Sequence, residues 1–125
     1  PVGMKAGLVS LQKMASMNLW KELEQRTMTF SEKLQAGFKS MGKDLTVTSY
    51  ASLFWIHGTS ATQIRRVDQI PKNQGPDFKK LFLKCLDRGI YLAPNAYEVG
   101  FISAAHTPEI LDKTADIILE VAREV

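Results

Sequence analysis

The stretch that decides the fold of this chain is YLAPNAYEVGFISAAH, residues 91–106. An apolar run ends at Ala93, residues 94–95 supply a Pro-Asn turn, and a second apolar run follows with Gly100 inside it. Glu98 is the only carboxylate in the stretch. A charge beside a buried strand costs free energy unless it has a partner. Glu98 is therefore the first candidate functional residue, although a solvated Glu with no such role is the commoner case.

The composition predicts one soluble globular domain. The chain has 125 residues, of which 45% are hydrophobic and 23% charged, enough for a sizeable core. No apolar run approaches the roughly 20 residues of a membrane helix, and no signal peptide is visible. The net charge of +3 comes from Lys and Arg interleaved with acids, so neither a membrane nor a nucleic-acid partner is expected. The single cysteine, Cys85, favours a reducing compartment such as the cytoplasm.

Hydrophobic periodicity predicts four helices. They cover residues 1–17, a segment from an Asn18 cap to residues 41–42, residues 76–88, and a last segment capped by Thr107. The first is apolar on more than one side, which predicts burial against more than one neighbour. The expected buried stripes are formed by Leu23, Phe30, Leu34, Phe38, Met41, Phe78, Leu81, Phe82, Cys85, Leu86, Ile110, Leu111, Ile117, Ile118 and Val121.

The strands predict the fold class. Residues 45–57 are rich in Val, Thr, Phe, Trp and Ile and form one or two strands, and residues 90–93 and 99–104 form two more. Because tight turns join them, we expect an α+β fold with a small antiparallel or mixed sheet of three to four strands and helices on one face. Residues 58–75 are a long polar connection, and its Arg65-Arg66 pair is best explained as solvated charge.

A search for chemistry finds little. There is no glycine-rich phosphate loop and no paired-cysteine metal site, so no metal is expected. His57 and His106 could each be a ligand or a base, but neither has a regularly spaced partner, and a structural role is favoured. Cys85 lies on an apolar helical stripe, which favours the core over nucleophilic chemistry. Residues and spacing alone lead to an α+β domain and no further.

Residues 91–107 resemble the C-terminal motif of the glutamate-1-semialdehyde 2,1-aminomutases, a class III, fold-type I family that uses pyridoxal phosphate. The family pattern is Tyr-Leu-Ala-Pro, then aromatic-Glu-x-Gly-Phe, then Ser-x-Ala-His-Thr. Matching it are Tyr91, Leu92, Ala93, Pro94, Tyr97, Glu98, Gly100, Phe101, Ser103, Ala105, His106 and Thr107. The order of the remaining segments is similar, including Pro1-Val2 before a small-residue helix and SLFWIH in residues 52–57.

The resemblance implies that residues 1–125 are a single C-terminal domain of a larger, homodimeric enzyme. Residues 1–17 would be the helix that links it to a large domain binding pyridoxal phosphate. The cofactor lysine would lie upstream, so no catalytic or cofactor-binding residue is expected here, and this piece alone would be inactive without bound cofactor. The parent enzyme would be an isomerase that converts glutamate-1-semialdehyde to 5-aminolevulinate in tetrapyrrole (porphyrin) synthesis.

By the same resemblance, Glu98 is the expected substrate-binding residue. Many related aminotransferases place an arginine nearby for a substrate carboxylate, whereas the aminomutase reaction passes through a diamino acid whose ammonium groups suit an anion. The chain departs from the usual family pattern at Ala51, where glycine is common, at Leu53, where methionine is common, and at Asn95, where serine is common. Two alternatives remain: another class III aminotransferase with a different amine substrate, or a non-catalytic α+β interaction module.

Overall fold

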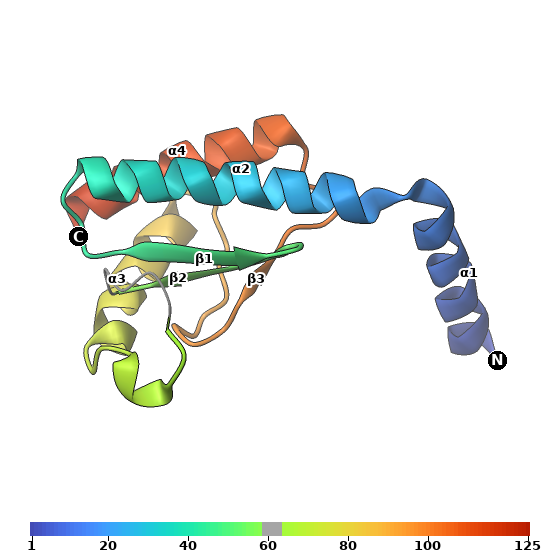
Figure 1. The fold of residues 1–125 in the computed structure, drawn as a ribbon, viewed down its shortest axis with the longest axis horizontal. Coiled ribbons are helices and arrows are strands. Elements are labelled where there is room, and N and C mark those ends of the chain that lie inside the picture. Colours follow the sequence, from blue (N-terminus) through green and yellow to red (C-terminus); the bar gives the residue numbers. More distant parts are fainter. Residues whose placement is uncertain (59–63) are drawn as a thin grey trace.

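The computed structural model describes residues 1–58 and 64–125, and the chain follows the expected order of elements (Figure 1). These are α1 (Val2–Met17), α2 (Leu19–Ser40), β1 (Thr46–Tyr50), β2 (Leu53–His57), the short 3-10 helix η1 (Val67–Gln69), α3 (Gln74–Asp87), β3 (Gly100–Phe101) and α4 (Pro108–Glu124). Each of the four expected helices is present within about two residues of its predicted bounds, which confirms the pattern analysis.

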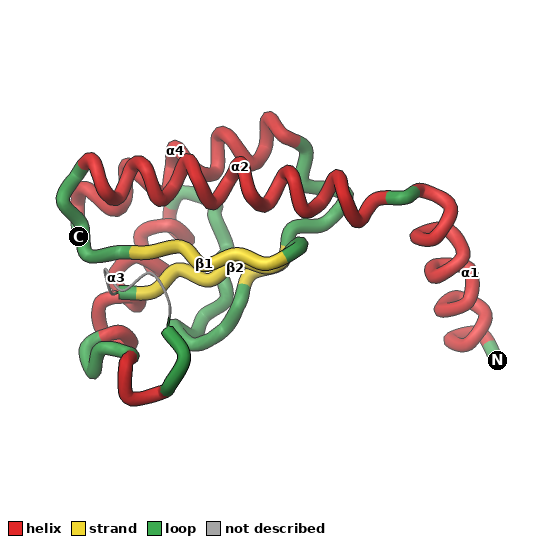
Figure 2. Tube along the Cα trace, viewed as in Figure 1, coloured by secondary structure: helices red, strands yellow, loops and turns green. Residues whose placement is uncertain are grey.

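The described strands form one antiparallel sheet in the order β1-β2-β3. β1 and β2 make a hairpin in which Tyr50 lies opposite Leu53, and β3 joins the other edge of β2 with Phe101 opposite Leu53. Helix α2 lies along β1 and β2, α4 packs beside α2, and α3 packs against α4 (Figures 1 and 2). The expected α+β fold, a small antiparallel sheet covered by helices, is confirmed.

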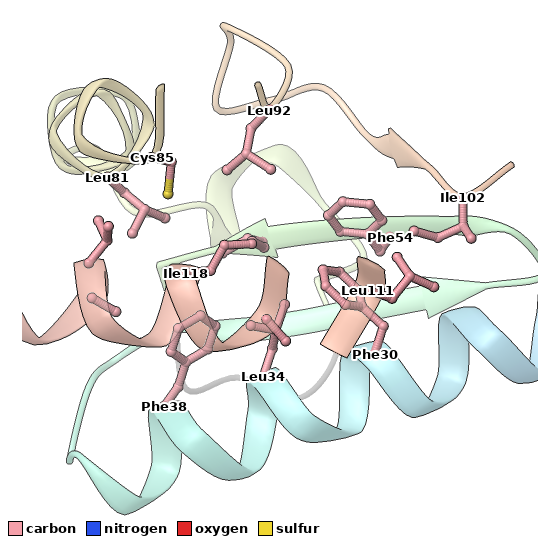
Figure 3. Packing of buried hydrophobic residues seen from close by; sticks show 14 of the residues in the cluster. Phe30, Leu34, Phe38, Phe54, Leu81, Cys85, Leu92, Ile102, Leu111 and Ile118 are labelled. Atoms are coloured by element: carbon pink, nitrogen blue, oxygen red, sulfur yellow. The ribbon is translucent and has the colours of Figure 1, made fainter. Parts of the chain in front are cut away.

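The core fills the space between the sheet and the helices. Phe30, Leu34 and Phe38 point from α2 toward the sheet, where the Phe30 and Phe54 rings meet edge to face with centroids 5.2 Å apart (Figure 3). The other buried members shown there include Leu81, Cys85, Leu92, Ile102, Leu111 and Ile118. Most of the predicted stripes are therefore correct, and Cys85 is a core residue as expected.

Local signals placed the later helix ends well. Gly42 and Gly89 follow α2 and α3 with φ of 65° and 81°, a backbone region that glycine enters without steric cost. The hydroxyl of Thr107 accepts a hydrogen bond from the Ile110 amide at 3.3 Å, so Thr107 caps α4 as predicted.

Three details differ from the prediction. Helix α2 does begin directly after Asn18, but Asn18 has a left-handed backbone with φ of 48° and makes no side-chain hydrogen bond as a cap. Helix α3 begins at Gln74 because Pro76 lies in its first turn, where a missing N–H costs nothing. Residues 90–93 belong to no strand of the described chain; the run is apolar because Leu92 packs in the core.

The second strand of the 91–106 stretch is also shorter than expected, since β3 contains only Gly100 and Phe101. The backbone then turns at residues 103–106, where the His106 amide donates to the Ser103 carbonyl at 3.0 Å. Of the predicted 58–75 connection, residues 59–63 lie outside the described residues, and η1 interrupts the remainder.

Helix α1 differs most from expectation, because none of its residues is buried within this chain. It extends away from the packed body (Figure 1) and exposes apolar side chains along its length, among them Met4, Leu8 and Leu11. The prediction that α1 is buried against more than one neighbour is therefore not met within residues 1–58 and 64–125. None of the helices in the described part of the chain is both long and apolar enough to cross a membrane.

Candidate functional site

The turn that carries Glu98 is organised by Asn95. The Asn95 side-chain oxygen accepts a hydrogen bond from the Tyr97 amide at 3.0 Å, and its backbone carbonyl accepts one from the Glu98 amide at 3.1 Å. Asparagine stabilises turns in this way because its short side chain reaches the backbone two residues on. The Pro-Asn signal in the sequence therefore gives the turn that was predicted, with β3 starting two residues after Glu98.

Glu98 lies at an open cavity of about 460 Å³. Glu98 itself is exposed. Much of the cavity wall comes from core side chains such as Phe30, Phe54 and Leu111. No described Lys, Arg or His forms an ion pair with Glu98 within 4.0 Å. A carboxylate with an unpaired charge beside an apolar wall is suited to a cationic ligand group.

A hydrogen-bonded cluster holds the same turn from behind. The carbonyl of Ala96 accepts from the indole Nε1 of Trp55 at 2.8 Å and from the side-chain Nε2 of Gln74 at 3.2 Å. Ala96 and Gln74 are both buried. Neither Trp55 nor Gln74 is among the candidate site residues that the sequence predicts. A signal existed, because Gln74 lies four and seven residues before Phe78 and Leu81 and so interrupts their apolar stripe with an amide.

The other end of the stretch is fixed by His106 and Arg26. The Nδ1 of His106 accepts from the Ser103 amide at 2.9 Å and lies 3.0 Å from the Ser103 hydroxyl. Arg26, on α2, donates to the carbonyls of Ala104 at 3.4 Å and His106 at 2.9 Å. His106 lines the same cavity as Glu98, but its Nδ1 is engaged in closing the turn before α4. These contacts support the structural role that the sequence favoured.

His57 is buried at the end of β2. Its Nε2 lies 2.9 Å from the Thr48 hydroxyl, and its ring packs against Trp55 with centroids 4.6 Å apart. Burial lowers the pKa of His57 below its usual 6.5, so the ring is neutral at physiological pH. No cluster of three or more His, Cys, Asp or Glu side chains in the described residues has the geometry of a metal site.

The lining of the cavity beside Glu98 is mostly apolar and is not suited to binding a phosphate. None of the described residues that line it is Lys or Arg, and its ionisable side chains are Glu98, His106 and Tyr91. A phosphorylated cofactor needs cations or clustered amide donors around its phosphate. The described lining therefore lacks the groups that hold a phosphate, and its one carboxylate, Glu98, suits a cationic ligand group.

Comparison with solved structures defines the class of fold. The chain resembles part of a β-phenylalanine aminotransferase from Variovorax paradoxus, with a TM-score of 0.67 and 20% identity over 82% of this chain and 22% of that one. It also resembles part of an omega-transaminase from Sphaerobacter thermophilus, with a TM-score of 0.60 and 20% identity over 84% of this chain and 25% of that one. The chain thus shares its fold with segments of these two aminotransferases.

Comparison with curated sequences is more specific. The chain is 55% identical over 122 residues to the glutamate-1-semialdehyde 2,1-aminomutase of Bdellovibrio bacteriovorus, which covers 98% of this chain and 29% of that protein. The proteins of the same name from Leptospira biflexa and Leptospira interrogans are both 39% identical to this chain, over 93% and 94% of its length respectively. No family profile matches the chain. The chain is homologous to these aminomutases, as the 91–107 motif indicated, and spans less than a third of their length.

Proposed function

We propose that residues 1–125 form the C-terminal domain of a pyridoxal phosphate-dependent aminomutase that converts glutamate-1-semialdehyde to 5-aminolevulinate for tetrapyrrole synthesis. The observation that carries the proposal is the 55% identity to such an aminomutase over 98% of the chain. By the same similarity, we expect the complete protein to be a cytoplasmic homodimer.

In this proposal Glu98 binds an ammonium group of the substrate. Its carboxylate is exposed at the cavity and has no cationic partner among the described side chains. The apolar wall around it excludes part of the water that would otherwise screen the interaction. Glu98 thus orients the amine as it moves between adjacent carbons, by a charge-assisted hydrogen bond.

Pyridoxal phosphate, when bound, supplies the electron sink for the carbanion chemistry. The lysine and the phosphate-binding groups that hold it are assigned to parts of the complete protein outside these residues. The wall beside Glu98, which has no lysine or arginine among its described residues, supports this division of roles. The chain contributes substrate orientation and one side of the cavity.

The exposed apolar helix α1 favours this proposal over a self-contained interaction module. A free-standing domain normally buries an apolar stripe of this length, because contiguous exposed apolar surface is costly in water. Val2, Met4 and Leu11 are instead each more than 60% exposed. The proposal assigns α1 to the link with a large domain of the same protein, against which this surface would be buried.

The test uses the complete protein. Purified protein loaded with pyridoxal phosphate is given glutamate-1-semialdehyde, and formation of 5-aminolevulinate is followed. Rapid product formation supports the aminomutase. No product, together with turnover of another amino donor, would support the second candidate, an aminotransferase with a different amine substrate, which the fold shared with the two solved aminotransferases favours.

Replacing Glu98 by Gln tests its role. Glu98→Gln keeps the size of the side chain and removes the charge, so kcat/KM for glutamate-1-semialdehyde should fall roughly 10- to 100-fold, the value of one charged hydrogen bond. Glu32→Gln, an exposed change on α2, is the matched control and should leave kcat/KM unchanged. Equal kcat/KM for Glu98→Gln and the wild type would remove Glu98 from the site.

A further inference from the structure

We propose that Gln74, with Trp55, is a positioning residue for Glu98, acting through the carbonyl of Ala96; the inference rests on the proposed function of Glu98. Gln74 begins α3 and is 3% exposed. Trp55 lies in the middle of β2. Trp55 and Gln74 lie 41 and 22 residues before Ala96 in the sequence, and both donate to the one carbonyl oxygen of the turn that presents the carboxylate.

The Gln74 amide connects the turn to the sheet. Its Nε2 donates to the carbonyls of Ala96, at 3.2 Å, and Ile56, at 3.4 Å, and its Oε1 accepts from the Gly58 amide. Both amide hydrogens and one oxygen lone pair are therefore in use. A buried amide is tolerated only when its hydrogen bonds are made, and here they span the end of β2 and the turn.

The connection to Glu98 is short. Ala96 is buried and lies between Asn95, which closes the turn, and Tyr97, whose amide donates to the Asn95 side chain. The Glu98 amide donates to the Asn95 carbonyl at 3.1 Å. The Ala96 carbonyl and the Tyr97 amide share one peptide plane, so fixing the carbonyl fixes that plane, and with it the direction of the chain that leads into Glu98. A displacement of about 1 Å at a binding carboxylate is enough to lower a rate substantially.

The first arm of the test is kinetic and uses the complete, cofactor-loaded protein. Gln74→Met removes the amide at similar volume, and Trp55→Phe removes the indole N–H while keeping an aromatic ring. Each should lower kcat/KM for glutamate-1-semialdehyde by about tenfold. Gln25→Met, an exposed change on α2, is the control and should leave kcat/KM unchanged.

A double-mutant cycle separates positioning from general damage. If Gln74 acts through Glu98, the loss caused by Gln74→Met should shrink to less than about twofold in a Glu98→Gln background. The same tenfold loss in both backgrounds would overturn the proposal. So would unchanged kcat/KM in both Gln74→Met and Trp55→Phe.

The second arm needs no activity, so it stands even if the proposed function fails. In Gln74→Met and in Trp55→Phe, hydrogen exchange at the Tyr97 and Glu98 amides should quicken by about tenfold while exchange in α4 stays unchanged. Unchanged exchange at both amides in both variants would overturn the proposal. Failure of the proposed function would appear separately, as a wild-type protein that makes no 5-aminolevulinate.

A charged variant gives a further readout. Gln74→Glu retains an acceptor for Gly58 but sets a carboxylate against the carbonyls of Ala96 and Ile56 when it ionises. Its protonated form can still donate one hydrogen bond. Relative to the wild type, kcat/KM of Gln74→Glu should therefore recover as the pH is lowered, whereas a pH-independent ratio would contradict the role of the Gln74 donor.

Discussion

Ala51 occupies a backbone conformation that suits glycine. It is the first of two residues between β1 and β2, and its φ is 50° while that of Ser52 is not positive. The type II′ turn has this pattern and places glycine at the first position. Ala51 is also one of the positions at which the chain departs from the pattern of the family that its sequence resembles, and the positive φ gives this departure a local structural cost.

Ala51→Gly should therefore raise the free energy of unfolding by about 0.5–1 kcal/mol, because the left-handed region penalises a Cβ by more than glycine loses in entropy. Urea denaturation followed by circular dichroism measures the change. Gly89→Ala is the reverse control: its φ is 81° and its added Cβ meets open space, so the conformational cost alone should lower stability by about 1 kcal/mol. A less stable Ala51→Gly would contradict this assignment of the turn.

Cys85 gives a prediction for alkaline pH. Burial raises the pKa of the Cys85 thiol from 9.0 to about 11, partly opposed by the charge of Arg88. Between pH 9 and 11 the unfolded state loses the thiol proton while the folded state keeps it, so stability should fall as the pH rises, by roughly 2–3 kcal/mol over that window. Unfolding free energies measured from pH 8 to 10.5 should show a shallower fall in Cys85→Ala. Equal slopes in the two proteins would rule out this contribution.

At the scale of elements, Gly100 lets β3 pass close over the Phe54 ring of β2. A Cβ added at Gly100 would lie 2.3 Å from the ring, which is itself packed in the core against Phe30. The glycine inside the quoted stretch is thus required by close approach and not by a positive φ.

Gly100→Ala should lower the free energy of unfolding by about 1–3 kcal/mol, the usual cost of overpacking a core. Thermal or urea denaturation measures it. Gly75→Ala, in the first turn of α3 with open space around its Cβ, should change stability by less than about 1 kcal/mol in either direction. Similar losses of unfolding free energy in Gly100→Ala and Gly75→Ala would contradict the prediction, because they would mean that the Phe54 ring gives way to the added Cβ without cost.

For the whole molecule, the exposed side of α1 has a consequence in solution. Met4, Leu8 and Leu11 lie at i, i+4 and i+7 and are each at least half exposed. Contiguous apolar surface of this kind favours association. The 125-residue chain expressed alone should therefore elute above its 14.0 kDa monomer mass on sizing, in a concentration-dependent way.

Lysine at all three positions should return the chain to the monomer mass, since charged side chains oppose burial of the stripe. The control replaces Leu83 and Leu86, two exposed apolar residues of α3, by lysine and should leave the association unchanged. A wild-type chain that stays monomeric at high concentration would show that α1 is not the associating surface.

Sequence alone was sufficient for the features that local chemistry controls. The apolar stripe of α2, the Thr107 cap and the glycines after α2 and α3 follow from periodicity and backbone preference. The Pro-Asn turn before Glu98 likewise follows from the reach of the asparagine side chain. The resemblance to the aminomutases could also be read from residues 91–107, because a motif match depends only on residue types and their spacing along the chain.

Only the tertiary structure decided which apolar runs pair as strands and which polar groups meet. Residues 90–93 looked like a strand, yet Leu92 is apolar because it enters the core, and periodicity cannot separate these two causes over four residues. The meeting of Trp55, Gln74 and the Ala96 carbonyl depends on long-range packing that brings β2, α3 and the turn together. Hydrophobic pattern records how much a residue is buried, whereas the partner of a buried hydrogen-bonding group is set by the fold in three dimensions.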